Sequence, residues 1–155
     1  MTVRVVTDST CDLPADVVNQ LGIKVIPLYI RIGDRDLLDG IDISRNEFYK
    51  ELPGFSDHPT TAVPSPQKFH SVYGALAEEG ATEVLSIHIS STLSATADVA
   101  RTAAAEMDTV PVTVVDSGQL SLGIGFLVHT AAQMAVNGAT VAEILPVLED
   151  QIKRT

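Results

Sequence analysis

The sequence predicts an α/β domain with a mainly parallel sheet and helices on both faces. Short runs rich in β-branched residues alternate with longer segments that begin and end with helix caps. This alternation is typical of parallel strands joined by helices. The strand runs also lack a strict polar and apolar alternation, as expected for strands covered on both faces.

Four strands are expected from the β-branched runs. They cover residues 3–6, 23–32, 83–89 and 112–115. Each run is bounded by polar or turn-forming residues, which limit strand length.

Six helices are expected, mainly from the residues at their ends. They cover residues 14–21, 44–52, 65–80, 94–107, 122–137 and 140–153. Residues 44–47 and 140–143 form capping boxes, and Ser65 followed by Pro66 places proline at the first helical position. Pro146 falls inside the last helix and is expected to kink it.

Length and composition favour one packed domain. The chain has 155 residues, of which 45% are hydrophobic and 19% charged, so it can bury a core without disulfides or metals. Its formal charge of −10 disfavours nucleic acid and anionic lipid as partners. Cys11 is the only cysteine, which excludes an internal disulfide and fits a cytoplasmic location.

One long stretch without charge raises the question of a membrane span. Residues 117–142 contain no Asp, Glu, Lys or Arg, a length that could cross a bilayer. Polar side chains and glycines interrupt the stretch, and lipid would penalise those polar groups. We therefore expect a helix buried in the protein interior and no membrane-spanning segment.

Polar residues follow three of the expected strands. They are Asp8, Ser9, Thr10, His88, Ser90, Ser91, Thr92, Ser94, Asp116 and Ser117. The carboxyl ends of parallel strands meet at one sheet edge, where such folds bind ligands. A further hydroxyl cluster, Thr60, Thr61 and Ser65, precedes a helix. We expect several of these segments to converge on one site.

Hydroxyls and free backbone N–H groups can bind a small anion without a positive charge. No basic residue lies between Lys68 and Arg101 or between Arg101 and Lys153, so a polyphosphate would be poorly neutralised. A carboxylate fits better. The competing interpretation is that these serines and threonines only cap helices and form turns.

Enzymatic alternatives have weaker support. Asp8 or Asp116 could serve phosphoryl or acyl transfer, but no second aspartate two residues after Asp8 supports a magnesium site. Hydrolysis would use His88 near Ser90, yet no G-x-S-x-G motif is present. Cys11 has no identifiable partner base. The aspartates at 36, 39 and 42 lack the EF-hand pattern and indicate a solvated turn, so no metal site is expected.

Several ordered motifs together resemble the DegV family. They are the strings at residues 6–14, 25–28, 39–40 with 43–44 and 48–49, Thr61 followed by 64–66, 86–96 and 115–117. Members of this family are bacterial fatty-acid-binding proteins. Some are similar to FakB subunits, which hold a fatty acid while a separate kinase phosphorylates its carboxylate. The resemblance therefore implies a carrier with a long-chain fatty acid as ligand and no cofactor, and not a catalyst.

The resemblance also implies particular residues. The carboxylate-binding threonine corresponds to Thr61 and the serine to Ser91, with neighbouring Ser90 as the alternative match and Ser94 in the same motif. From the polar residues at the strand ends, and not from the resemblance, we expect the pocket lining to include Asp8, Ser9, His88, Thr92, Asp116 and Ser117. Residues 62–63 are Ala-Val instead of the family's usual Ser-Gln, and Ala95 replaces the usual glycine.

Family members are about twice this length and have a second domain that helps to enclose the acyl chain. Residues 1–155 are therefore expected to form a single domain equivalent to the N-terminal one, without the C-terminal domain. Such a domain is expected to expose an apolar face and to self-associate. A fatty acid kinase subunit is its expected protein partner.

Overall fold

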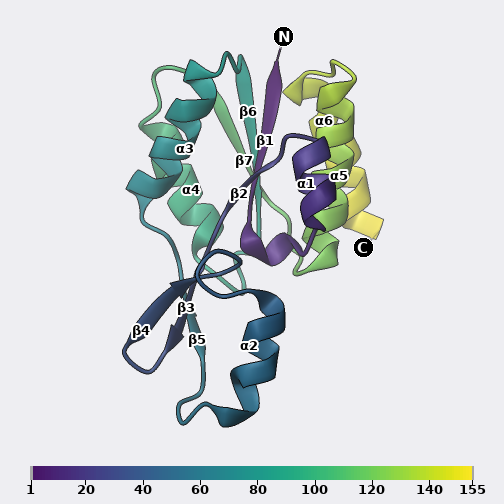
Figure 1. Ribbon diagram of the computed structural model, residues 1–155. Coiled ribbons are helices and arrows are strands. Elements are labelled where there is room, and N and C mark those ends of the chain that lie inside the picture. The colour runs from purple at the N-terminus through teal and green to yellow at the C-terminus, as the bar shows by residue number, and fades with distance from the viewer. Residues whose placement is uncertain (1, 155) are drawn as a thin grey trace.

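The computed structural model describes residues 2–154 and is built around a four-stranded parallel sheet (Figure 1). The strand order is β2-β1-β6-β7. The strands are β1 (Val3–Asp8), β2 (Lys24–Ile26), β6 (Glu83–His88) and β7 (Val112–Asp116). All three pairings are parallel. The predicted parallel sheet is confirmed.

Helices cover both faces of this sheet, as predicted. One face carries α3 (Pro66–Glu78) and α4 (Thr96–Ala105), and the other carries α1 (Ala15–Gln20), α5 (Leu122–Val136) and α6 (Val141–Arg154) (Figure 1). We refer to the sheet and these five helices as the parallel-sheet layer. The predicted ends of all six helices agree with the observed ones within two residues.

The strands divide their side chains between two hydrophobic cores. Val5 and Leu85 are buried in the core under α5 and α6, whereas Val6 and Val84 are buried in the core under α3 and α4. Successive residues of a strand point to opposite faces, so β1 and β6 each supply both cores. Burying one such side chain contributes about 1.5–3 kcal/mol.

The prediction of one strand over residues 23–32 is wrong. The chain leaves the parallel sheet after Ile26, and β3 (Tyr29–Ile32) belongs to a second, antiparallel sheet. Pro27 has no N–H to donate to a neighbouring strand. The Leu28 N–H donates instead to Ser9 Oγ at 3.1 Å, so the two residues between the strands turn the chain away.

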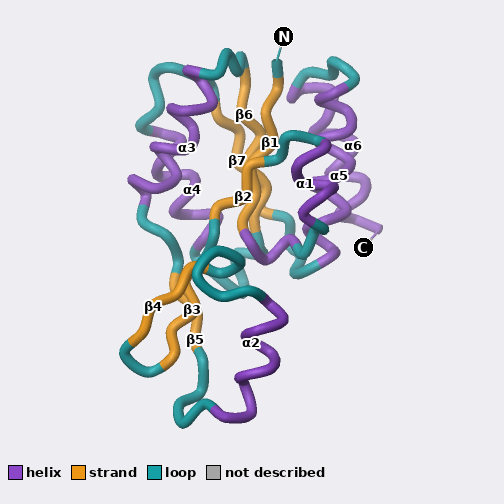
Figure 2. Tube along the Cα trace, in the orientation of Figure 1, coloured by secondary structure: helices purple, strands orange, loops and turns teal. Residues whose placement is uncertain are grey.

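The second sheet was not predicted. Its order is β4-β3-β5, with β4 at Arg35–Leu38 and β5 at Thr60–Ala62. Together with α2 (Arg45–Glu51) it forms a small lobe of residues 29–62. This lobe lies beyond the carboxyl ends of β1 and β6 (Figures 1 and 2). It therefore extends the edge at which a ligand was expected.

The capping boxes predicted from sequence are present. In α2 the Ser44 hydroxyl accepts from the Glu47 amide at 3.2 Å, and the Ser44 amide donates to the Glu47 carboxylate at 3.0 Å. The Thr140 and Glu143 pair makes the same exchange before α6. Pro146 lies exposed within α6, which runs through it.

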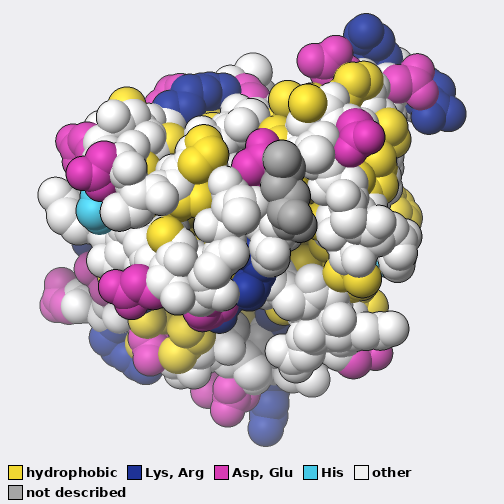
Figure 3. Space-filling model, turned by 90° about the horizontal axis from the view of Figure 1, so that it is seen from above, with side chains coloured by type: hydrophobic (Ala, Val, Ile, Leu, Met, Phe, Trp, Pro, Cys, Tyr) yellow, Lys and Arg dark blue, Asp and Glu magenta, His cyan; other side chains and the backbone are white. Residues whose placement is uncertain are grey.

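The long uncharged stretch forms α5, whose residues Ile124, Leu127 and Val128 are buried in the core. Among residues 2–154, no helix is both long and apolar enough to cross a membrane. Figure 3 views the amino-terminal edge of the sheet, opposite the expected site. Its acidic and basic side chains are interspersed around the rim, and no broad basic surface appears on this face, in keeping with the formal charge of −10.

Candidate functional site

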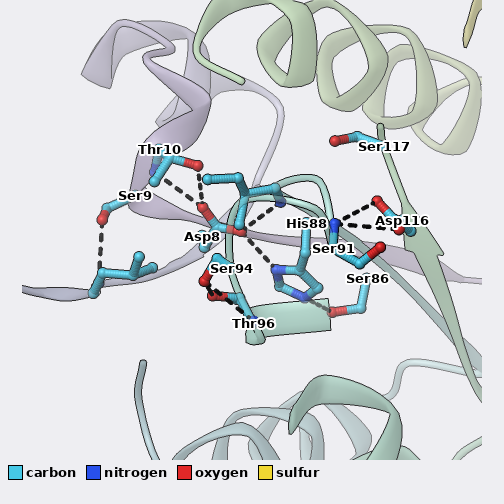
Figure 4. A network of polar contacts seen from close by, with 12 residues as sticks. Asp8, Ser9, Thr10, Ser86, His88, Ser91, Ser94, Thr96, Asp116 and Ser117 are labelled. Carbon is cyan, nitrogen blue, oxygen red and sulfur yellow. Dashed lines mark hydrogen bonds and ion pairs between the residues drawn. The ribbon is translucent and has the colours of Figure 1, made fainter. Parts of the chain in front are cut away.

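Three strands deliver polar residues to one edge of the parallel sheet (Figure 4). The register pairs Thr7 with Ile87 and His88 with Asp116. Asp8, His88 and Asp116 therefore stand at neighbouring strand ends, as the sequence predicted.

Asp8 is the centre of a buried hydrogen-bond network. One carboxylate oxygen accepts from His88 Nδ1 at 2.9 Å and from the Ile89 amide at 3.1 Å. The other accepts from the Thr10 amide at 3.0 Å and from the Thr10 hydroxyl. Burial raises the pKa of Asp8, but the hydrogen bond and charge of His88, with the Thr10 and Ile89 bonds, outweigh burial and hold the pKa below its ordinary value. Asp8 is thus a fixed carboxylate that joins two loops.

The network continues from His88 into the core. Ser86 Oγ lies 2.7 Å from His88 Nε2 and 2.9 Å from the Tyr73 hydroxyl. His88 Nδ1 faces Asp8 and its Nε2 faces Ser86, which in turn contacts Tyr73. Each of these buried polar groups therefore has a hydrogen-bond partner. Burial raises the pKa of Tyr73 to about 12, although the Ser86 bond lowers it in part.

The connectivity Ser86–His88–Asp8 has the order of a hydrolase triad, but its setting does not suit catalysis. All three residues are fully buried, and Ser86 already contacts Tyr73. A nucleophilic serine has to reach a substrate. The network is therefore structural, and the partner of His88 is Ser86 and not Ser90.

The hydroxyl loop after β6 is tied to the loop after β7. The Ser90 amide donates to the Gln119 carbonyl at 3.0 Å. The Ser91 amide donates to the Asp116 carboxylate at 3.2 and 3.3 Å. Burial raises the pKa of Asp116, but the Ser91 side chain, the Gly118 and Ser91 amides and the charge of Arg101 outweigh burial and lower it.

Several of the predicted site hydroxyls have local partners. The Thr92 hydroxyl lies 2.9 Å from Ser90 Oγ, and Ser94 Oγ lies 2.8 Å from the Thr96 hydroxyl at the start of α4. Ser117 Oγ accepts from the Gln119 amide at 3.1 Å. For these residues the interpretation as turn and cap formers describes their contacts well. Ser91 is exposed, whereas Ser90 is buried.

Thr61 lies in β5 of the small lobe and lines a cavity between this lobe and the parallel-sheet layer. The cavity measures about 460 Å³. Ile30 and Phe48 supply apolar lining from the lobe, and Leu120 supplies it from the layer. Ser90, Ser91 and Ser94 are not among its lining residues, but Gln119, which holds Ser90, precedes Leu120 in the chain.

Sequence reasoning missed a charged group in this cavity. Arg45, Asp12 and Ser121 all line it, and Asp12 accepts hydrogen bonds from both Arg45 and Ser121. The partners lie 33 and 109 residues from Asp12 in the chain. No local sequence signal connects residues so far apart.

Within residues 2–154, no group of three His, Cys, Asp or Glu side chains could hold a metal ion. Two of the aspartates at positions 36, 39 and 42 have separate partners: Asp36 pairs with Arg31, and Asp42 accepts from the Leu38 amide.

Cys11 is buried, and burial is the main cause of its raised pKa. A thiol of this kind is poorly suited to nucleophilic catalysis.

Comparison with known proteins shows the family. The family model described as the DegV family of uncharacterised proteins matches residues 2–155. A DegV domain-containing protein of Streptomyces coelicolor is 40% identical over 154 residues, which is 99% of this chain and 54% of the relative. The chain belongs to the DegV family.

Two solved structures of similar proteins share the fold and are described by their fatty acid binding. A DegV family protein of Thermus thermophilus, described by its fatty acid binding, aligns with a TM-score of 0.89 at 38% identity. DegV of Bacillus subtilis, described as a fatty acid binding protein, aligns with a TM-score of 0.93 at 31% identity. In both cases 99% of this chain and 54% of the other are covered. The chain thus spans about half the length of these relatives.

Proposed function

We propose that this protein binds a long-chain fatty acid and holds it by the carboxylate. The observation that carries the proposal is the close likeness to the Thermus and Bacillus proteins, which are described as fatty acid binding. In this proposal Thr61 and Ser91 donate to the ligand carboxylate, with Ser90 and Ser94 beside them. In this proposal the fatty acid is the ligand, and no cofactor takes part.

The chemistry of the lining supports this proposal. Thr61 faces a cavity with apolar side chains on both sides, and each buried CH₂ group of a ligand contributes about 0.8 kcal/mol. The Ser91 amide and side chain both interact with Asp116, so in this proposal the Ser91 hydroxyl rotates away from Asp116 to donate to the ligand. Asp8, His88 and Asp116 would support the loops and not contact the ligand.

The enzymatic alternative based on Asp8 or Asp116 has less support. Both oxygens of Asp8 accept hydrogen bonds within the fully buried network. Asp116 is engaged by the Ser91 and Gly118 amides. A nucleophilic carboxylate needs a free oxygen that can reach the substrate.

Mass spectrometry of lipid extracted from the purified protein tests the proposal. We expect a co-purified long-chain fatty acid in near-stoichiometric amount with the protein. A protein that carries no fatty acid and also fails to take up added palmitate would contradict the proposal.

We further propose that the bound fatty acid is presented to a separate kinase in the cytoplasm. There a carboxylate oxygen attacks the γ-phosphorus of ATP, the bond to the β-phosphate breaks, and ADP leaves as the acyl phosphate forms. Such a carrier leaves the chemistry to its partner. Hydroxylamine, which traps acyl phosphates as hydroxamates, should then detect product only when the carrier, the kinase, ATP and fatty acid are all present. Product formed without the carrier would argue against this role.

We also propose that residues 1–155 act as the N-terminal domain of a two-domain arrangement, as in relatives of about twice this length. Leu93, Leu120, Leu122 and Phe126 are large apolar side chains that remain exposed. Exposed apolar patches tend to recruit partners. We expect residues 1–155 alone to self-associate and to bind palmitate weakly. A sedimentation experiment showing only monomer, together with tight palmitate binding, would contradict this expectation.

A further inference from the structure

The small lobe carries Thr61 but shares little apolar surface with the parallel-sheet layer. Its aromatic rings contact one another: Phe48 lies 5.5 Å from Tyr49 and 5.9 Å from Phe55 between ring centroids. Among the described residues, neither hydrophobic core includes a residue of the lobe. Because the lobe adds no residue to either core, polar contacts and the two chain connections contribute to the placement of Thr61 relative to the layer.

Arg45 makes the main polar contacts across this boundary. It is the first residue of α2. Its Nη2 donates to the Ser9 carbonyl at 2.6 Å, and its Nη1 donates to the Asp12 carboxylate. Nη2 also lies 3.9 Å from Asp39 within the lobe. One guanidinium thus joins α2 to the loop that follows β1.

Asp12 extends this link to α5. Its second carboxylate oxygen accepts from the Ser121 hydroxyl at the start of that helix. In the described part of the chain, Asp12 and Ser121 are the two non-glycine residues with positive φ, at 54° and 57°. Such conformations are unfavourable for residues with a Cβ and persist where the surroundings fix them. Here they direct the two side chains toward each other.

The same group separates two cavities. Arg45 and Asp12 line the cavity of about 460 Å³ that contains Thr61. They also line a second cavity of about 470 Å³ on the side of α1, which includes Leu13 and Val18. The Arg45–Asp12 pair is therefore both a wall of the proposed binding cavity and the contact between the lobe and the layer.

We infer that Arg45 is a positioning residue for fatty-acid binding. By holding Asp12 and the Ser9 carbonyl, it fixes the lobe so that Thr61 faces the sheet edge that carries Ser91. This inference rests on the proposed function. It differs from simple charge attraction between Arg45 and the ligand carboxylate, because the Arg45 charge is already matched by Asp12 and Asp39.

Substitutions on both sides of the pair separate positioning from charge attraction. Asp12→Asn removes a negative charge beside the cavity. Charge attraction alone would then strengthen binding of the anion palmitate, whereas loss of the contact would weaken it. Arg45→Lys keeps the charge but cannot donate in the same forked geometry to a carboxylate and a carbonyl. Positioning therefore predicts that Arg45→Lys behaves like Arg45→Gln.

Arg31→Gln is the matched control. Arg31 is a cation of the same lobe, and its bonds to Asp36 at 2.7 and 2.9 Å stay within the β3–β4 hairpin. The control variant thus loses the same charge and an ion pair of the same kind. It leaves the boundary between the lobe and the layer intact.

The experiment is calorimetric titration with palmitate of the protein at its natural length, with amide hydrogen exchange measured on the same samples. We expect Arg45→Gln, Arg45→Lys and Asp12→Asn each to weaken palmitate binding about threefold or more, as for loss of a partly exposed ion pair within a network. In these three variants, amide hydrogen exchange should be faster in β5 and α2 and unchanged in β1 and β6. Arg31→Gln should change neither result.

Other outcomes would overturn the inference, and they are distinguishable. Stronger palmitate binding by Asp12→Asn would show charge attraction in place of positioning. If Arg45→Gln and Arg31→Gln had the same palmitate affinity and the same amide exchange rates, the contact of Arg45 with Asp12 and the Ser9 carbonyl would have no role in binding. If the unsubstituted protein failed to bind palmitate, the proposed function itself would fail, and the inference with it.

Discussion

Replacing Asp8 by asparagine is expected to lower the free energy of unfolding by about 3 kcal/mol or more, since several buried donors would lose a charged acceptor. Asp8 accepts from His88, Thr10 and Ile89. The asparagine amide has the same shape as the aspartate carboxylate. Its NH₂ group, however, would face N–H or O–H donors and could not accept their hydrogen bonds. Denaturant unfolding at pH 7 measures the difference, and Asp108→Asn, at an exposed position in the loop before β7, should stay within about 0.5 kcal/mol.

The Asp8 substitution also has a pH signature. The pKa of Asp8 is lowered in the folded protein, so the unfolded chain binds the proton more readily. The stabilisation is therefore complete above the unfolded value of about 3.9 and is lost as pH falls through the lower folded value. In Asp8→Asn the loss of stability between pH 7 and pH 3 should be smaller than in the unsubstituted protein. If the free energy of unfolding fell equally between pH 7 and pH 3 in Asp8→Asn and in the unsubstituted protein, Asp8 would not be a buried carboxylate with a lowered pKa.

Replacing Gly125 by alanine is the second substitution with a large expected effect. An added Cβ would lie 2.5 Å from the Cys11 carbonyl oxygen and 3.3 Å from the Leu13 side chain. Because the first of these atoms is backbone, α5 would have to move away from the loop after β1. Overpacking of this kind costs about 1–3 kcal/mol. Thermal unfolding of the purified variant measures it.

Gly123→Ala is a matched control on the same helix. Its Cβ would meet the Gln119 side chain at 3.0 Å, and none of the three atoms nearest to it would be backbone, so the side chain has to give only slightly. Alanine also favours the helix over glycine by up to about 1 kcal/mol. We expect Gly123→Ala to be clearly less destabilising than Gly125→Ala. Equal melting temperatures for the two variants would argue against close packing of α5 on the loop after β1.

The fold could be predicted where local signals were strong. Capping boxes at residues 44–47 and 140–143 define helix starts, and apolar runs define β1, β6 and β7. The small lobe could not be predicted in the same way. The run over residues 23–32 is apolar except for Lys24 and Arg31, and it hides the change of sheet after Ile26. The β4 strand begins with charged residues whose strand conformation depends on pairing with β3.

The same division applies to the site. Asp8, His88 and Asp116 were predicted at one edge because parallel topology alone brings strand ends together. The Ser86 and Tyr73 part of the network depends on how α3 packs on the sheet. Arg45 and Ser121 depend on contacts between segments far apart in the chain. Side-chain partners of this kind follow from tertiary structure, and the sequence carries no period or motif for them.

Whether Thr61 and Ser91 bind a fatty-acid carboxylate is the central question, and one comparison tests it directly. Calorimetric titrations of Thr61→Ala and Ser91→Ala with palmitate and with hexadecanol compare two ligands that differ only in the head group. A hydroxyl donor to a charged acceptor contributes about 1.5–3 kcal/mol, so we expect palmitate binding to weaken about tenfold or more and hexadecanol binding to change less. Ser71→Ala, which removes a hydroxyl that donates to the Gln67 carbonyl within α3, should affect neither ligand. Equal losses for palmitate and hexadecanol in the Thr61 and Ser91 variants would contradict the assignment.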